Sequence, residues 1–122
     1  MKLKLPERRR FVRIETPLKV VIETKEGNCE VITTNVSPVG LRFDIMKELV
    51  GNEEINMFLY IPTSDAPVKL VCKLVWQTKN SLEDTAPFDV GVEIIHVNEE
   101  NKNEFLKYLC DLLYKSIYKA RV

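Results

Sequence analysis

The 122-residue sequence is poor in the residues that build metal sites, because it has one histidine and three cysteines. No two cysteines stand at CxxC spacing, and the single histidine, His96, could join them in a zinc site only if residues far apart in the sequence came together. It also has no apolar run of about 18 or more residues, so we expect no membrane span. We therefore expect no metal, and three reduced cysteines in the core: Cys29, Cys72 and Cys110.

The sequence also lacks the short motifs of the common enzyme classes. It contains no nucleophile elbow, no GxGxxG segment and no P-loop. The acidic pairs Glu53-Glu54 and Glu99-Glu100 flank expected turns or caps, where carboxylates are solvated rather than held in the unlike environments that catalysis requires. We therefore expect a chain that is not an enzyme.

What the sequence does have is an uneven distribution of charge. It has 18 basic and 18 acidic residues, hence a formal net charge of zero. Residues 1–13 hold six basic residues and one acidic residue, so this segment carries +5 and the remainder −5. It has no apolar stretch of a secretory signal, so we expect a cytoplasmic protein. A local cationic segment on an acidic body favours a compact anionic ligand over a long nucleic acid.

Between residues 17 and 97, apolar and polar residues alternate with the period of two that is typical of β-strands. We expect strands over residues 17–25, 28–34, 40–45, 54–62, 68–80 and 88–97. In the fifth strand the pattern places Leu70, Cys72, Leu74 and Trp76 on one face. For Trp76, core packing is therefore the favoured interpretation and a ligand contact the alternative.

From Asn98 onward the pattern becomes helical. Apolar residues recur at helical spacing through residues 98–120, and Asn98 is suited to cap the first turn. Strands followed by one helix indicate a mainly β fold, a small six-stranded antiparallel β-barrel with a C-terminal α-helix, and a sandwich is the alternative. We expect one domain with a flexible basic lead-in (1–14), a barrel (15–97) and the helix (98–122). Three helical tyrosines would cover the rim or form a partner surface: Tyr108, Tyr114 and Tyr118.

Two short motifs stand out from this pattern. Arg9-Arg10-Phe11-Val12-Arg13 has the form RxxxR and is preceded by Arg8. Asn35-Val36-Ser37-Pro38-Val39-Gly40 has the preferences of a type I β-turn from Ser37 to Gly40, which is a sufficient structural reason for it. The amide of Asn35 and the hydroxyl of Ser37 would also project together beside backbone N–H groups, as in sites for phosphates or base edges.

With these two motifs the chain resembles the PilZ domain, the bacterial receptor module for the second messenger cyclic di-GMP. RxxxR and [D/N]xSxxG are both matched, in order, with a strand-length gap between them. A weaker likeness is Trp76 followed by the strand residues Gly91-Val92-Glu93-Ile94, and the resemblance covers residues 6 to 118. RxxxR alone is common by chance in chains of this length, whereas both motifs on this strand pattern are a strong signal.

The resemblance implies that cyclic di-GMP is the ligand and that the arginines contact it. Arg9 and Arg13 would hold phosphates and guanine edges, because a guanidinium binds both as a fork. An arginine at the position of Arg8 accompanies a stacked ligand dimer in similar domains, and Arg10 is a further candidate contact. Without ligand the cationic lead-in should be poorly ordered, and binding should fold it onto the barrel.

The second motif would form the fixed half of the same site. By the resemblance, Asn35 would read a guanine edge and Ser37 would support a base or a phosphate. Gly40 has no Cβ and would let the backbone come close to the ligand. Trp76 is the remaining candidate contact, as the alternative to its place in the core.

The function that the resemblance implies is a receptor that changes conformation on binding cyclic di-GMP and signals to an unidentified protein partner. Motility, polysaccharide or secretion machinery would be that partner. One alternative is a small nucleic-acid-binding barrel, whose affinity should fall steeply with salt. Against this alternative, no ladder of aromatic residues accompanies the basic residues. Another is a PilZ-like protein adaptor that works without the ligand.

Overall fold

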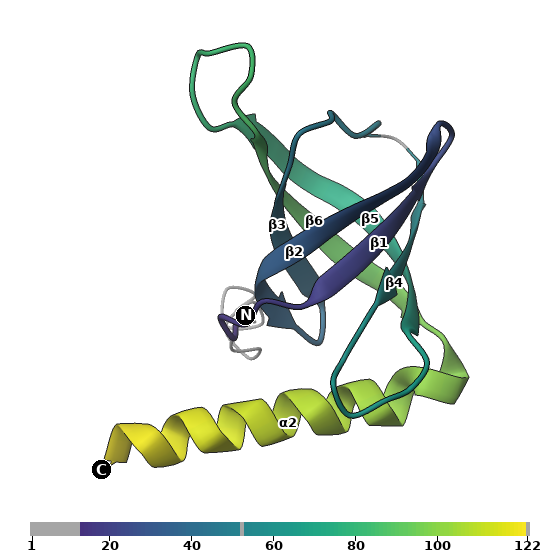
Figure 1. Ribbon diagram of the computed structural model, residues 1–122. Helices are drawn as coiled ribbons and strands as arrows, with labels where there is room; N and C mark the ends of the chain where they lie inside the picture. The colour runs from purple at the N-terminus through teal and green to yellow at the C-terminus, as the bar shows by residue number, and fades with distance from the viewer. Residues whose placement is uncertain (1–12, 52, 122) are drawn as a thin grey trace, which may run out of the picture.

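The computed structural model describes residues 13–51 and 53–121 of the chain, and the side chains of its helix as far as residue 115. The strands are β1 (Lys19–Thr24), β2 (Gly27–Ser37), β3 (Gly40–Ile45), β4 (Ile55–Leu59), β5 (Val68–Lys79) and β6 (Phe88–Val97). They form a closed antiparallel barrel in the order β1-β2-β3-β6-β5-β4, and helix α2 (Glu99–Arg121) follows (Figure 1). The predicted six-stranded barrel with a C-terminal helix is confirmed.

The barrel interior is filled by alternate apolar side chains from every strand. The largest fully buried ones in the strands are Val20, Ile22, Val36, Phe43, Met57, Leu59, Val68, Leu70, Cys72 and Val90. Burying a side chain of this size contributes about 1.5–3 kcal/mol each. The alternation read from the sequence therefore placed most of the core correctly.

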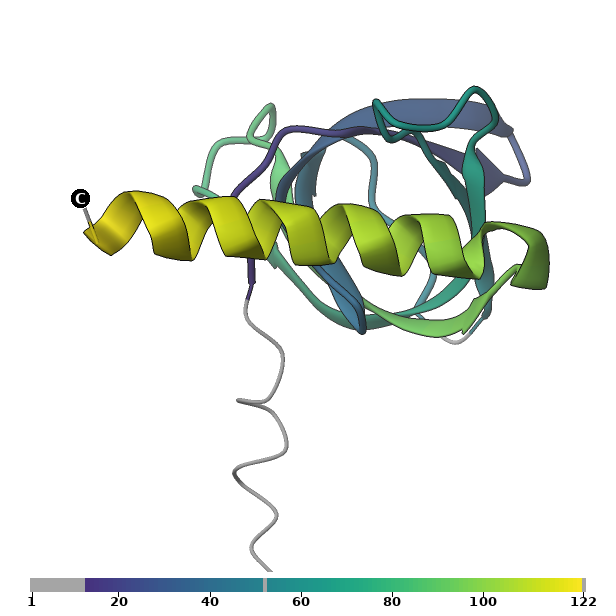
Figure 2. The ribbon, with the colours of Figure 1, turned by 90° about the horizontal axis from the view of Figure 1, so that it is seen from below.

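Helix α2 closes one end of this barrel. Its first turn is capped by Asn98, whose Oδ1 accepts a hydrogen bond from the N–H of Glu100 at 3.0 Å. Phe105, Tyr108 and Leu109 are buried against the barrel, and the later part of the helix projects beyond the strands (Figure 2). The expected place of Tyr108 is thus confirmed. Tyr114 is exposed, and the side chain of Tyr118 lies outside the described residues.

The three cysteines occupy three different environments. Cys72 is fully buried, and this burial raises the pKa of its thiol to about 12. Cys29 is partly buried, whereas Cys110 is exposed. All three are free thiols. The expectation that all lie in the core is therefore right for Cys72 and wrong for Cys110, because Cys110 lies on the solvent face of α2.

The segment that precedes β1 is tied to β2 by a buried hydroxyl group. The Thr33 hydroxyl accepts a hydrogen bond from the N–H of Leu18 at 2.9 Å and donates one to the carbonyl of Thr16 at 2.6 Å. Further along, Ile14 and Val36 exchange two backbone hydrogen bonds of 2.9 Å. These contacts bring the start of the described chain alongside the end of β2.

We predict that Thr33→Val lowers the free energy of unfolding by about 1–3 kcal/mol, because the buried N–H of Leu18 loses its acceptor. Urea denaturation followed by circular dichroism measures this. Thr34→Val is the matched control, since the Thr34 hydroxyl is exposed and has water as a substitute partner. Equal losses in the two variants would contradict this account.

Candidate ligand-binding site

A β-bulge in β2 determines which way the second motif faces. Thr33 pairs with Phe43 and Asn35 pairs with Arg42, so Thr34 is an extra residue between the two pairs. One extra residue exchanges the inward and outward faces of the strand beyond it. Asn35 therefore lies on the outer face of the barrel, where unbroken alternation with Thr33 would have turned it inward.

A second bulge, in β5, does the same for the only tryptophan of the chain. Leu74 pairs with Val92 and Trp76 pairs with Gly91, which leaves Val75 as the extra residue. Trp76 is consequently on the outer face and partly buried. The prediction that it packs in the core beside Leu74 is wrong, because strict alternation does not continue across the bulge.

The two bulges align four residues in one row across neighbouring strands. The row consists of Asn35 in β2, Arg42 in β3, Gly91 in β6 and Trp76 in β5, each paired with the next. We call these four residues the outer row. Neighbouring strands lie about 4.8 Å apart, so the row spans roughly 14 Å measured along the sheet.

Gly91 allows the indole of Trp76 to lie against the backbone of β6. A Cβ atom at residue 91 would lie 2.2–2.4 Å from three ring carbons of Trp76, far inside any real contact distance. With no side chain between them, the Trp76 ring centre lies 5.8 Å from the guanidinium carbon of Arg42. This separation is within the range of a cation–π contact.

Arg42 is held from its other side by Asp89. Its Nε donates to Oδ1 at 2.9 Å and its Nη2 donates to Oδ2 at 2.7 Å, which is a bidentate fork. These hydrogen bonds and the charge of Asp89 raise the pKa of Arg42 further above its ordinary value. Asp44, which pairs directly with Asp89, adds to this effect. The guanidinium is therefore fixed in place and permanently charged.

The hydroxyl of Ser37 is used by the turn of its own motif. It accepts a hydrogen bond from the N–H of Val39 at 3.2 Å and faces the carbonyl of Gly40 at 3.4 Å, and the residue is only 4% exposed. The carbonyl of Val39 in turn accepts the N–H of Ile94 at 2.8 Å. Ser37 thus fixes the shape of the turn and its place against β6.

Gly40 has a reason within the fold that is separate from any ligand. A Cβ atom there would lie 2.7 Å from the carbonyl oxygen of Val92, which is backbone and has little freedom to move. A side chain at this position would push β3 away from β6. The close approach of a ligand to Gly40 stays a prediction.

Arg13 lies at the border of the same region. Ile14 and Val36 form an antiparallel bridge, so Arg13 comes level with Ser37, and its side chain is exposed. The structure therefore groups four of the predicted residues around the end of β2 and the turn: Arg13, Asn35, Ser37 and Gly40. Trp76 lies at the far end of the outer row. The remaining predicted residues lie outside the described part of the chain: Arg8, Arg9 and Arg10.

Arg42 and Asp89 are the residues that sequence reasoning missed. The alternation of residues 40–45 did place Arg42 outward, but an outward arginine on a strand is ordinary. Its partner is 47 residues further along the chain, and no local pattern links the two. The signal becomes visible only when the strand register is known.

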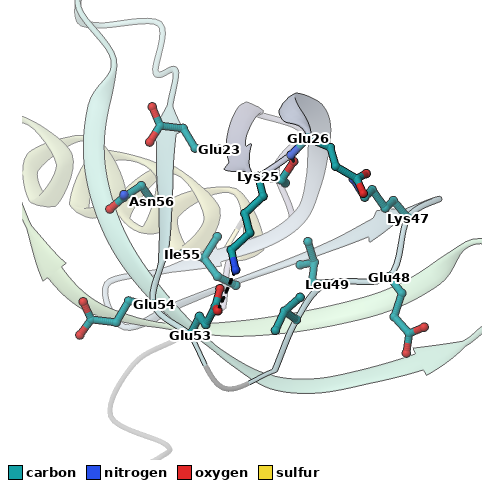
Figure 3. A pocket seen from close by; sticks show the side chains of 12 residues that line it. Glu23, Lys25, Glu26, Lys47, Glu48, Leu49, Glu53, Glu54, Ile55 and Asn56 are labelled. Carbon is teal, nitrogen blue, oxygen red and sulfur yellow. Dashed lines mark hydrogen bonds and ion pairs between the residues drawn. The ribbon is translucent and has the colours of Figure 1, made fainter.

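A different hollow lies at the opposite end of the barrel, where the β1–β2 turn meets the β3–β4 loop. It has a volume of about 380 Å³. Figure 3 shows its charged lining, in which Lys25 reaches Glu53 at 3.4 Å and Lys47 pairs with Glu26. Five glutamates and two lysines line it: Glu23, Glu26, Glu48, Glu53, Glu54, Lys25 and Lys47. This acidic lining is unsuited to an anionic ligand.

Residues 13–51 and 53–121 contain no group of three or more histidine, cysteine, aspartate or glutamate side chains that could hold a metal ion. Among these same residues, no helix is both long enough and apolar enough to cross a bilayer.

The closed barrel places the outer row beside the turn of the second motif, and a comparison with known proteins assigns this barrel to a family. Residues 7–110 match the family model of the PilZ domain, so this chain belongs to the PilZ family. The resemblance inferred from the two motifs is confirmed. A search of the curated proteins finds no match.

Solved structures agree in fold at low sequence identity. The inhibitor of motility MotI/DgrA from Bacillus subtilis is 15% identical, with a TM-score of 0.72, over 88% of this chain and 52% of that one. YcgR from Escherichia coli in complex with c-di-GMP is 14% identical, with a TM-score of 0.70, over 93% of this chain and 50% of that one. The PilZ domain of YcgR with c-di-GMP is 12% identical, with a TM-score of 0.68, over 93% of this chain and 98% of that one. This chain therefore spans about half the length of the first two proteins.

We predict that Gly91→Ala displaces the Trp76 indole from β6, because the new methyl group would overlap three of its ring carbons. The displaced ring becomes more exposed, so the fluorescence emission of this single tryptophan should shift to longer wavelength. Gly51→Ala is the control, since its Cβ would meet Leu74 at an ordinary 3.6 Å. An unchanged emission maximum in Gly91→Ala would refute the placement of Trp76.

Proposed function

We propose that this chain is a non-catalytic receptor domain that binds cyclic di-GMP and passes the binding event to a protein partner. The observation that carries the proposal is the gathering of Arg13 and the second motif beside the outer row, on one face of a PilZ barrel. Two of the similar structures are of YcgR with c-di-GMP, which supports the same ligand for this chain.

The side chains at this face suit the chemistry of that ligand. Cyclic di-GMP presents two phosphates and two guanines. Guanidinium groups such as that of Arg13, with Arg8, Arg9 and Arg10 preceding it, bind phosphate oxygens and guanine edges. The amide of Asn35 is suited to a guanine edge, and the indole of Trp76 offers a face on which a base stacks. Ser37 contributes by fixing the turn from which Asn35 and Gly40 are presented.

The proposed mechanism divides the chain into three parts. The lead-in (1–14) carries the positive charge, the barrel (15–97) carries the fixed half of the site, and the helix (98–122) closes the barrel. Binding a dianionic ligand neutralises part of the lead-in charge and brings it against the barrel, which changes the surface offered to a partner. We place this receptor in the cytoplasm, with motility, polysaccharide or secretion machinery as the partner. The likeness to an inhibitor of motility supports the first of these.

We predict that the protein binds cyclic di-GMP in isothermal titration calorimetry and that Arg13→Ala weakens this binding about tenfold or more, through the loss of charge-assisted hydrogen bonds. Lys69→Ala removes the same charge from an exposed position on β5 and should leave the affinity unchanged. Cyclic di-AMP, which lacks the guanine edge, should bind far more weakly. A ligand-to-protein ratio near two would support a stacked ligand dimer.

The same titrations separate the alternatives. The absence of any heat with cyclic di-GMP would overturn the receptor proposal. Binding to a single-stranded oligonucleotide that falls steeply with salt, without preference for the cyclic dinucleotide, would establish the nucleic-acid function instead. A protein that binds neither would act as an adaptor.

A further inference from the structure

We infer that Arg42 is a guanine-binding residue of this site, a guanidinium fixed on the barrel and aimed at the O6/N7 edge of the base. This inference rests on the proposed function, since it names a further contact for the same ligand. It adds to the two motifs a residue that belongs to neither of them.

Position is the first argument for Arg42. In the outer row it lies between Asn35 on one side and Gly91, covered by Trp76, on the other. An amide, a guanidinium and an indole are the three kinds of group that bind a base through its edges and its face. Their alignment in one row requires both bulges, and a row of ordinary surface residues would require neither.

Availability is the second argument. A guanidinium has five N–H groups, and the fork to Asp89 uses two of them, which leaves three for a ligand. The side chain of Arg42 is 42% exposed, so a ligand at the outer row can reach it. Asp89 therefore orients the guanidinium without occupying it fully.

Preorganisation is the third argument. Asp89 and the Trp76 ring hold Arg42 from two sides before any ligand arrives. A side chain that is already ordered loses little conformational freedom on binding, so its hydrogen bonds contribute more fully to affinity. Arginine is also the residue that most often binds guanine, through O6 and N7 together.

The rival explanation is that Arg42 only joins β3 to β6. Asp44 and Asp89 face each other across these strands, and a cation beside them relieves their repulsion. A lysine would serve that purpose as well, and it would not recognise a guanine edge as a fork does. The two explanations therefore differ in what happens when one atom of the ligand is changed.

The test is a thermodynamic cycle that combines substitution of Arg42 with replacement of the guanine N7 atom. Cyclic di-GMP and its 7-deaza analogue, in which carbon replaces N7 of both guanines, are titrated into the wild type, Arg42→Gln and Arg42→Lys. We expect Arg42→Gln to weaken cyclic di-GMP about tenfold. We also expect the 7-deaza substitution to weaken binding to the wild type several-fold more than binding to either variant. Lys69→Gln controls for the loss of one charge and should behave as the wild type.

Each outcome shows whether or not Arg42 contacts the guanine edge. A 7-deaza penalty that is the same in the wild type and in both Arg42 variants, or absent from the wild type, would overturn the inference while leaving the receptor function intact. If the wild type does not bind cyclic di-GMP, the proposed function fails and this inference fails with it. Arg42→Lys keeps the charge between β3 and β6, so it remains informative if Arg42→Gln unfolds, which urea denaturation shows.

Discussion

The strict alternation of a β-strand is the constraint on which the candidate site depends. In a closed barrel each residue faces either the core or the solvent, and its neighbours along the strand face the other way. Had β2 and β5 kept this alternation throughout, Asn35 and Trp76 would point inward with Thr33 and Leu74. The extra residues Thr34 and Val75 turn both outward. Because the two bulges lie on strands on either side of β3 and β6, they bring both side chains into line with Arg42.

Two glycines, Gly40 and Gly91, make room for close contacts between neighbouring strands. The indole of Trp76 rests on β6 only because residue 91 has no Cβ. Gly40 solves a different problem, since a Cβ there would meet the carbonyl oxygen of Val92 and separate β3 from β6. The glycine of the second motif is therefore required by the sheet itself. Strand packing alone is therefore a sufficient reason for a glycine at this position of the motif.

Much of the fold could be predicted from the sequence because its determinants are local. Alternation gave the strands and most of the core, and the helical period with Asn98 gave α2 and its cap. The bulge in β5 could not be predicted, since Leu74 and Trp76 continue the apolar pattern on both sides of Val75. The fork between Arg42 and Asp89 depends on the β3–β6 register, which no local pattern specifies. The sequence therefore pointed to the motif residues of the candidate site, whereas the outer-row residue Arg42 and its partner Asp89 became visible only in the structure.

Charge divides the proposed site into two parts with different physical roles. The lead-in holds an excess of positive charge, so its attraction for an anionic ligand acts at a distance and weakens with salt. Arg42 carries its counter-charge with it in Asp89 and adds almost nothing to that long-range attraction. What a guanidinium that is fixed and already paired with a carboxylate offers is geometry, because its remaining N–H groups donate well only to a ligand with acceptors in matching places. In the proposed site, the lead-in before β1 would therefore supply most of the long-range attraction, and Arg42 on the barrel wall would add discrimination between bases.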